Sequence, residues 1–171
     1  GVDHSMLVAG NTPTAESIVM SEPSSTDRSI VMYRGATATI SEDEVELWSQ
    51  QIREGDIFVT EVSQVALEHV AQLLAVAQSK GALTALDVDV PPSVACHGTP
   101  QLGSEEELWG CLRRASVIKI TNVGARELVG GDGSPGDVLS ATAGQMAIVT
   151  DGEKGSRWST PEVPKAADRK P

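Results

Sequence analysis

Cysteine is scarce in this chain of 171 residues. Cys96 and Cys111 are too few for a disulfide scaffold, and they do not form a Cys-x-x-Cys pair. Taken with His69 and His97, they match no spacing typical of zinc ligands. We therefore predict no metal-ligating residues, and the cysteine usage favours a reducing, intracellular compartment.

Basic residues are also few, because 13 Lys and Arg stand against 24 Asp and Glu, which gives a formal net charge of -11. Such a charge repels nucleic acid and anionic membranes, so we expect neither as a partner. No apolar run approaches the roughly 20 residues of a membrane span, and residues 1–4 have no features of a signal peptide. We expect a cytoplasmic location. An organelle stays open because the chain begins with Gly1 and not Met, as a truncated or processed product would.

The pattern of the chain predicts two kinds of structure in succession. The β-prone runs 6–8, 17–20 and 29–33 come first, and the last two are separated by a polar stretch, which predicts an antiparallel ribbon. After residue 41 the spacing of apolar residues becomes helical, and short β-branched runs alternate with helices. Helices are expected over 41–54, 63–80, 104–112 and 122–129, and strands over 57–60, 83–90, 117–121, 146–150 and, at an edge, 156–159.

Strands that alternate with helices of this length indicate parallel pairing through right-handed crossovers. We therefore predict an α/β, Rossmann-like layered fold with a mostly parallel sheet flanked by helices. One domain spans residues 1–160, with a ribbon at about 6–36 and a core at about 41–160. Residues 161–171 are expected to form a flexible tail.

Polar and glycine residues follow four of the predicted strands. They are Thr60 and Glu61, Asp87 and Asp89, Thr121 and Asn122, and the run 150–155. Ligands of open parallel sheets bind at the carboxyl ends of the strands, so Asp87, Asn122 and Thr150 are expected to converge at one edge. Hydroxyls, backbone N–H groups and glycines suit a phosphate-containing ligand, and ordinary strand-to-helix turns explain the same residues equally well.

Residues 149–156, Val-Thr-Asp-Gly-Glu-Lys-Gly-Ser, resemble the Val-Thr-x-Gly-x-x-Gly-Ser/Ala segment of ribokinase-like carbohydrate kinases of the phosphofructokinase B type. Weaker similarities occur in the order of that family. They are Gly-Val-Asp at 1–3, Ser-Thr-Asp-Arg at 25–28, Tyr-Arg-Gly-Ala at 33–36, Leu-Asp-Val-Asp at 86–89, and the strand and helix at 117–130 that correspond to the family's Asn-Glu-x-Glu segment.

The resemblance implies an enzyme that transfers a phosphoryl group from ATP, with Mg²⁺, to a sugar hydroxyl. The implied nucleotide-binding residues are Thr150, Gly152, Gly155, Lys119 and Asn122. The implied substrate-binding residues are Tyr33, Arg34, Asp87 and Asp89. For Tyr33 and Arg34 a solvated ribbon end is an equal alternative. In this family such ribbons act as lids and as dimer contacts, which implies a homodimer through the ribbon.

Two departures from the family bear on activity. Depending on the register, Gly124 or Ala125 takes the position of the second Glu of the signature, so that acidic group is missing. The Gly-Ala-Gly-Asp motif with the catalytic Asp is not matched by residues 165–171, and the Gly-Gly segment that contacts sugar is not in the chain either. No catalytic residue is assigned. We interpret the chain as an incomplete and inactive central part of a kinase, and the alternative is a catalytically silent binding or regulatory module.

A second glycine-rich run, residues 131–136, satisfies the Gly-x-Gly-x-x-Gly pattern of dinucleotide-binding folds. It follows a helix and not a strand, and it carries Pro135 where the next helix would have to open. We therefore predict a glycine-rich loop at this place and no dinucleotide site.

Overall fold

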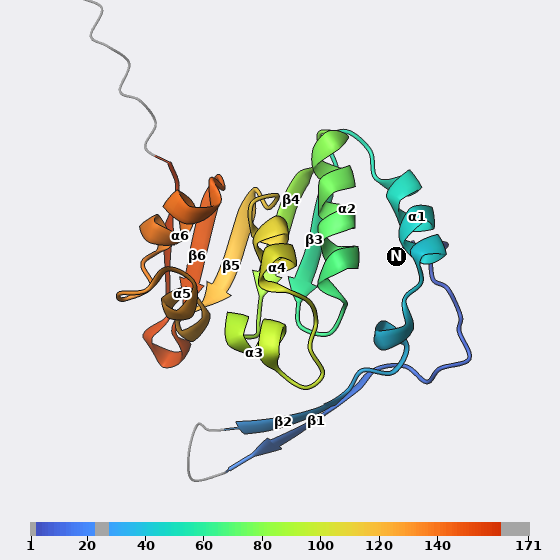
Figure 1. Ribbon diagram of the computed structural model, residues 1–171, viewed down its shortest axis with the longest axis horizontal. Helices are drawn as coiled ribbons and strands as arrows, with labels where there is room; N and C mark the ends of the chain where they lie inside the picture. Colours follow the sequence, from blue (N-terminus) through green and yellow to red (C-terminus); the bar gives the residue numbers. More distant parts are fainter. Residues whose placement is uncertain (1–2, 23–27, 162–171) are drawn as a thin grey trace, which may run out of the picture.

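A computed structural model describes residues 3–22 and 28–161 of the chain. The similarities noted at Gly1 and Val2 and at residues 25–27 lie outside these ranges, and so does the expected tail from residue 162 onward. Figure 1 shows a sheet with helices on one side and a separate two-stranded ribbon. None of the helices in the described ranges combines the length and apolar character that crossing a membrane requires.

The ribbon consists of β1 (Glu16–Ser21) and β2 (Arg28–Tyr33), which pair antiparallel with Glu16 opposite Tyr33. The predicted ribbon is therefore confirmed, and it projects away from the sheet (Figure 1). The strand expected at residues 6–8 is wrong. None of the strands in the described ranges pairs with this short segment, and the Met6 carbonyl instead accepts a hydrogen bond of 3.2 Å from Trp48 Nε1.

The second sheet has five strands in the order β3-β4-β5-β6-β7. The first four pair parallel, and β7 pairs antiparallel with β6 at the edge. Their bounds are β3 (Ile57–Val62), β4 (Leu83–Val88), β5 (Val117–Thr121), β6 (Met146–Thr150) and β7 (Ser156–Ser159). The predicted fold class, a mostly parallel α/β sheet with an antiparallel ribbon, is confirmed.

Six α-helices occur in the described residues: α1 (Glu42–Gln51), α2 (Leu67–Ser79), α3 (Pro92–His97), α4 (Glu105–Leu112), α5 (Asn122–Val129) and α6 (Pro135–Thr142). Two short 3-10 helices, η1 (Gly35–Thr39) and η2 (Gly152–Lys154), complete the elements. Ser41 with Glu44 and Ser104 with Glu107 form the expected capping boxes at the starts of α1 and α4.

Four helices differ from the sequence-based expectation. Helix α1 ends at Gln51 and not at residue 54. Helix α2 begins at Leu67 and not at residue 63, because the Leu67 N–H donates to the Leu102 carbonyl at 2.9 Å and fixes the chain there. The sequence pattern does not predict α3 and α6, because each begins with a proline, and proline inside a helix normally interrupts it. At the start of α6, Ser134 caps the helix and Pro135 occupies the first turn, where its missing N–H costs nothing.

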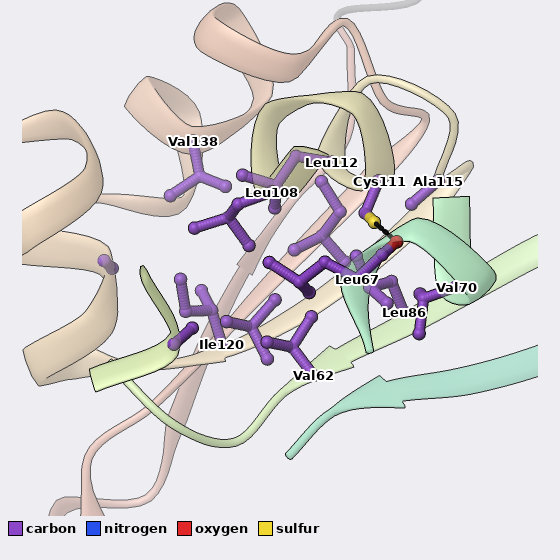
Figure 2. Close-up of a cluster of buried hydrophobic side chains, with 14 of the residues drawn as sticks. Val62, Leu67, Val70, Leu86, Leu108, Cys111, Leu112, Ala115, Ile120 and Val138 are labelled. Carbon is purple, nitrogen blue, oxygen red and sulfur yellow. Dashed lines mark hydrogen bonds between the residues drawn. The ribbon is translucent and has the colours of Figure 1, made fainter. Parts of the chain in front are cut away.

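The hydrophobic core lies between one face of the sheet and the helices (Figure 2). Alternate strand residues such as Leu86, Ile118 and Ile120 are fully buried against α2 and α4. Inside this core the Cys111 thiol donates to the Leu67 carbonyl at 3.6 Å, and burial raises the pKa of Cys111 to about 12. Cys111 therefore stays a neutral thiol and serves packing.

The other face of the sheet is much less covered. Ile57 and Val59 on β3 are 65% and 68% exposed, and Trp158 on β7 is 66% exposed. All described helices lie on the opposite side (Figure 1), as the alternation of buried residues along β4, β5 and β6 requires. Parallel sheets are normally covered on both faces, whereas this face leaves large apolar side chains exposed.

Thr84 connects β4 to the start of β5 inside the core and generates a stability prediction. Its hydroxyl donates to the Arg114 carbonyl at 2.7 Å and accepts from the Ser116 N–H at 2.9 Å, and the residue is 1% exposed. Thr84→Val keeps the shape and leaves both backbone groups unsatisfied, so we expect a loss of about 1–3 kcal/mol in the free energy of unfolding by urea denaturation. The exposed Thr39→Val is the control, with a change within about 0.5 kcal/mol. Equal stability of the two variants would contradict the role given to Thr84.

Candidate functional site

A cavity of about 630 Å³ opens at the carboxyl ends of β4, β5 and β6. These strands run parallel, so their last residues meet at one edge of the sheet. The lining residues come from the ends of these strands, the turn that joins β6 to β7, and the first residue of β2: Asp89, Lys119, Thr121, Asn122, Val123, Thr150, Asp151, Gly152, Gly155, Ser156 and Arg28.

Lys119 is the cation at the floor of this cavity. Its Nζ lies 2.7 Å from Asp87 Oδ1 and 2.9 Å from Asp87 Oδ2, and only the contact with Oδ2 has hydrogen-bond geometry. The same Nζ lies 3.5 Å from Asp89 Oδ1. The register places Glu61, Asp87 and Lys119 side by side on β3, β4 and β5. Burial opposes the charged form of Lys119, but the hydrogen bond and charge of Asp87 and the charge of Asp89 outweigh it and raise the pKa of Lys119. The ammonium group is therefore a fixed positive charge.

The turn between β6 and β7 forms one wall of the cavity. Thr150 ends β6, Gly152 begins η2, and Gly155 precedes β7. The Asp151 N–H donates to the Gly155 carbonyl at 2.8 Å and closes the turn. Gly152 and Gly155 have φ of 53° and 84°, values that favour glycine, and a Cβ on either would meet no atom within 4 Å. The backbone is thus open to close approach by a ligand.

The start of α5 forms the opposite wall. Thr121 caps the helix, and its hydroxyl accepts from the Gly124 N–H at 3.1 Å. Asn122 follows as the first helical residue and is 9% exposed. Its Oδ1 accepts a hydrogen bond of 3.3 Å from Arg157 Nη2. Neither Gly124 nor Ala125 lines the cavity, and Ala125 is fully buried in the core.

The structure brings six of the predicted site residues to this edge. Lys119, Asn122, Thr150, Gly152, Gly155 and Asp89 line the cavity, and Asp87 reaches it through Lys119. Their roles toward ligands stay predictions.

The two residues predicted at the ribbon end lie elsewhere. Arg34 lines a separate cavity of about 230 Å³ between the base of the ribbon, the loops that follow β3 and β4, and α3 with the segment after it. Its Nε is buried and has no hydrogen-bond partner in the described part of the chain. Tyr33 is 55% exposed and lines neither cavity. Gln64 joins the ribbon base to the sheet, since its Nε2 donates to Met32 Sδ at 3.6 Å.

Sequence analysis missed two arginines of the site. Arg28 lines the large cavity from the first residue of β2, and Arg157 holds Asn122 from β7. Arg28 ends the Ser-Thr-Asp-Arg run noted at 25–28, to which no site role was assigned, and the lone Arg157 carries no local signal of its position. Only the folding of the ribbon and the antiparallel return of β7 bring them here.

Glu61 generates a prediction on pH dependence. Burial and then the charges of Asp89 and Asp87 raise the pKa of the Glu61 carboxyl above its ordinary value of 4.5, against the opposing charge of Lys119. The ionised carboxylate of Glu61 therefore lowers the free energy of unfolding at neutral pH. This destabilisation disappears below pH 4.5, because the carboxyl is then protonated in both the folded and the unfolded state. We expect Glu61→Gln to be more stable than the wild type at pH 7 in urea denaturation, with the gain lost in acid.

The exposed Glu54→Gln is the matched control and should show no such pH-dependent gain. A gain for Glu61→Gln that is constant from pH 4 to pH 7 would contradict the electrostatic cause.

Comparisons with known proteins agree with this geometry. Over residues 1–169 the sequence matches the pfkB family of carbohydrate kinases. Among curated proteins none matches by sequence. Solved structures with a similar fold include ribokinase from Giardia lamblia, at 12% identity and a TM-score of 0.67 over 90% of this chain and 47% of that one. Adenosine kinase from Trypanosoma brucei brucei is 15% identical, with a TM-score of 0.64 over 93% and 52% of the two chains.

Ribokinase from Arabidopsis thaliana, whose structure was solved with ribose and ATP, is 18% identical, with a TM-score of 0.52 over 92% of this chain and 51% of that one. The chain thus spans about half the length of the solved structures it matches. At these identities the structural likeness shows the fold, and the match along the sequence shows the family. This chain belongs to the pfkB family of carbohydrate kinases.

Proposed function

We propose that this chain is the central part of an ATP-dependent kinase that phosphorylates a hydroxyl of a sugar or a sugar-like molecule. The observation that carries the proposal is the cavity at the strand ends, where the Lys119 ammonium, the Asn122 amide and the glycine turn at residues 152–155 face one space. In phosphoryl transfer the protein contributes positioning and stabilisation of charge more than covalent chemistry. A fixed cation and open backbone supply both.

The phosphates of the nucleotide lie in this cavity in our proposal. Lys119 Nζ offers a charge-assisted hydrogen bond to a phosphate oxygen, and the Thr150 hydroxyl and the Asn122 amide offer neutral ones. At Gly152 and Gly155 no side chain stands between the backbone and the ligand, which permits approach of a phosphate group. The wall formed by α5 adds the positive end of a helix dipole.

The charges that line the cavity balance, because Arg28 and Lys119 face Asp89 and Asp151. A bare triphosphate therefore meets no excess of positive charge. Asp89 and Asp151 carry oxygens of the kind that Mg²⁺ prefers, and Mg²⁺ usually takes one or two carboxylates together with substrate phosphates. They would hold the ion, which would neutralise phosphate charge.

The acceptor sugar is assigned to the neighbouring space between the ribbon and the sheet. Arg34 lines this space, and its buried Nε–H has no hydrogen-bond partner among the described residues, so this donor would suit a hydroxyl oxygen of the acceptor. Asp87 and Asp89 approach the same edge from the floor of the larger cavity. In the reaction the acceptor oxygen forms a bond to the γ-phosphorus, the bond from that phosphorus to the bridging oxygen of ADP breaks, and the hydroxyl proton passes to a base. We assign no base within the described residues.

A catalytically silent binding module is the second candidate, and one observation favours it. The positions that correspond to the second Glu of the family signature hold Gly124 and Ala125. A Cβ at Gly124 would lie 3.1 Å from Ile120 Cγ1, and Ala125 has no exposed surface, so neither place offers a carboxylate to the cavity. Phosphate handling through that group is then lost, while the nucleotide cavity is kept.

Nucleotide binding tests the proposal directly. We expect ATP to bind in isothermal titration calorimetry with Mg²⁺ present and to bind more weakly with EDTA, because the ion offsets the phosphate charge. Lys119→Met removes the fixed cation and should weaken binding of MgATP by about tenfold or more. Arg53→Met also removes one positive charge, at an exposed side chain that does not line the cavity, so its affinity should stay near that of the wild type. Equal losses in both variants, or no binding of ATP by the wild type, would contradict the proposal.

We also propose that two chains associate through the ribbon. Its large apolar side chains are exposed on both of its faces: Ile18, Val19, Met20, Ile30, Val31, Met32 and Tyr33. Exposed apolar patches of this kind mark contacts between proteins. Val31 is 55% exposed and sits opposite Ile18 in the ribbon, which makes it the residue to change.

Sedimentation velocity measures this association. We expect a dimer for the wild type and a monomer for Val31→Lys, because a buried ammonium without a partner would oppose the contact. Val59→Lys places the same charge at an apolar position on the sheet that is 68% exposed, and it should leave the dimer intact. A monomeric wild type, or dissociation only in Val59→Lys, would show that the ribbon is not the interface.

A further inference from the structure

Arg157 lies on the edge strand β7 and connects two segments that are far apart in the sequence. It pairs with Val149 of β6 and, like Val149, its side chain leaves the sheet on the side of the helices. Nη1 lies 3.4 Å from Asp132 Oδ2, and Nη2 lies 3.3 Å from the Asp132 carbonyl. The same Nη2 lies 3.3 Å from Asn122 Oδ1. The guanidinium thus joins the loop between α5 and α6 to the first residue of α5.

This contact fixes which end of the Asn122 amide faces Arg157. A guanidinium carries only donors, so the atom of Asn122 that it meets must be the carbonyl oxygen. The amide of asparagine otherwise turns about a broad, roughly two-fold torsion. Among the described residues, none accepts a hydrogen bond from Asn122 Nδ2. Its two N–H groups are therefore available to a ligand in the cavity that Asn122 lines.

The orientation decides the chemistry that Asn122 offers. With Oδ1 turned to Arg157, the cavity receives two donors, which suit phosphate oxygens. With the amide reversed, the cavity would receive an acceptor, which repels them. Arg157 itself does not line the cavity, so it acts through Asn122 and not on the ligand.

We propose that Arg157 is a positioning residue: held by Asp132, it orients the Asn122 amide so that Nδ2 donates to a phosphate oxygen of the bound nucleotide. This inference rests on the proposed function of the cavity. It extends that function to a residue on β7, which sits at the edge of the sheet and carries no part of the glycine turn. The competing interpretation is an ordinary surface ion pair with Asp132, since the Arg157 side chain is 45% exposed.

A double-mutant cycle separates the two interpretations. The affinity for MgATP and for magnesium tripolyphosphate is measured by calorimetry in the full chain for Arg157→Met, Asn122→Ala and the double variant. We expect Arg157→Met alone to weaken binding by about fivefold to tenfold, and to have no further effect in the Asn122→Ala background. An equal loss in both backgrounds would mean that Arg157 acts through its own charge, which overturns the proposal. Arg157→Lys replaces Arg157→Met if the latter does not fold, because lysine keeps the positive charge and lacks the planar set of N–H donors of the guanidinium.

A second readout works without any ligand and separates failure of this inference from failure of the proposed function. The side-chain amide resonances of Asn122 in the ¹⁵N-labelled, ligand-free protein should shift in Arg157→Lys and stay in place in Arg53→Met, a change at an exposed residue outside the cavity. If the wild type binds neither MgATP nor tripolyphosphate, the proposed function fails, and the role of Arg157 toward a nucleotide fails with it. If the wild type binds and the Asn122 resonances do not respond to Arg157→Lys, only the positioning role is overturned.

Discussion

Parallel pairing of β4, β5 and β6 is the constraint on which the rest of the site depends. It sets Asp87 beside Lys119 and Thr121 beside Thr150, so residues from three distant segments meet at one edge. Because side chains alternate along a strand, a slip of β5 by one residue would turn Lys119 into the core and Ile120 out of it. The fully buried Ile118 and Ile120 hold the register that presents Lys119 to the cavity. Core packing and site geometry are thus set by the same pairing.

The two faces of the sheet contribute to different parts of the structure. The helix-covered face supplies the cohesive core, and the other face carries the charges of Glu61, Asp87 and Lys119 near its edge. Lys119 makes the group of carboxylates tolerable, and the carboxylates in turn keep the ammonium charged. Ile57 and Val59 are exposed on that face, whereas parallel sheets are normally covered on both faces. Exposed apolar residues at these positions agree with our proposal that the chain is the central part of a larger enzyme.

Much of the fold could be predicted from local patterns. Strong alternation and β-branched runs gave β5, β6 and β7 with the bounds that the structure shows, and Ser-x-x-Glu patterns marked the starts of α1 and α4. Helices α3 and α6 were missed because a proline looks like a stop in the sequence. In the first turn of a helix its missing N–H is one that would have no partner within the helix anyway. The meeting of Asn122 and Thr150 followed from strand direction, whereas Arg28 and Arg157 reach the site only through tertiary contacts that no local pattern encodes.

The central claim is that the cavity at the strand ends receives the phosphates of a nucleotide. The most direct measurement is the change of backbone amide chemical shifts in the ¹⁵N-labelled chain during titration with MgATP. The account predicts that the largest changes cluster at Asn122, Gly152 and Gly155. Changes concentrated instead around the cavity between α3, α4 and α5, at residues such as Trp109, or an unchanged spectrum at saturating MgATP, would contradict it.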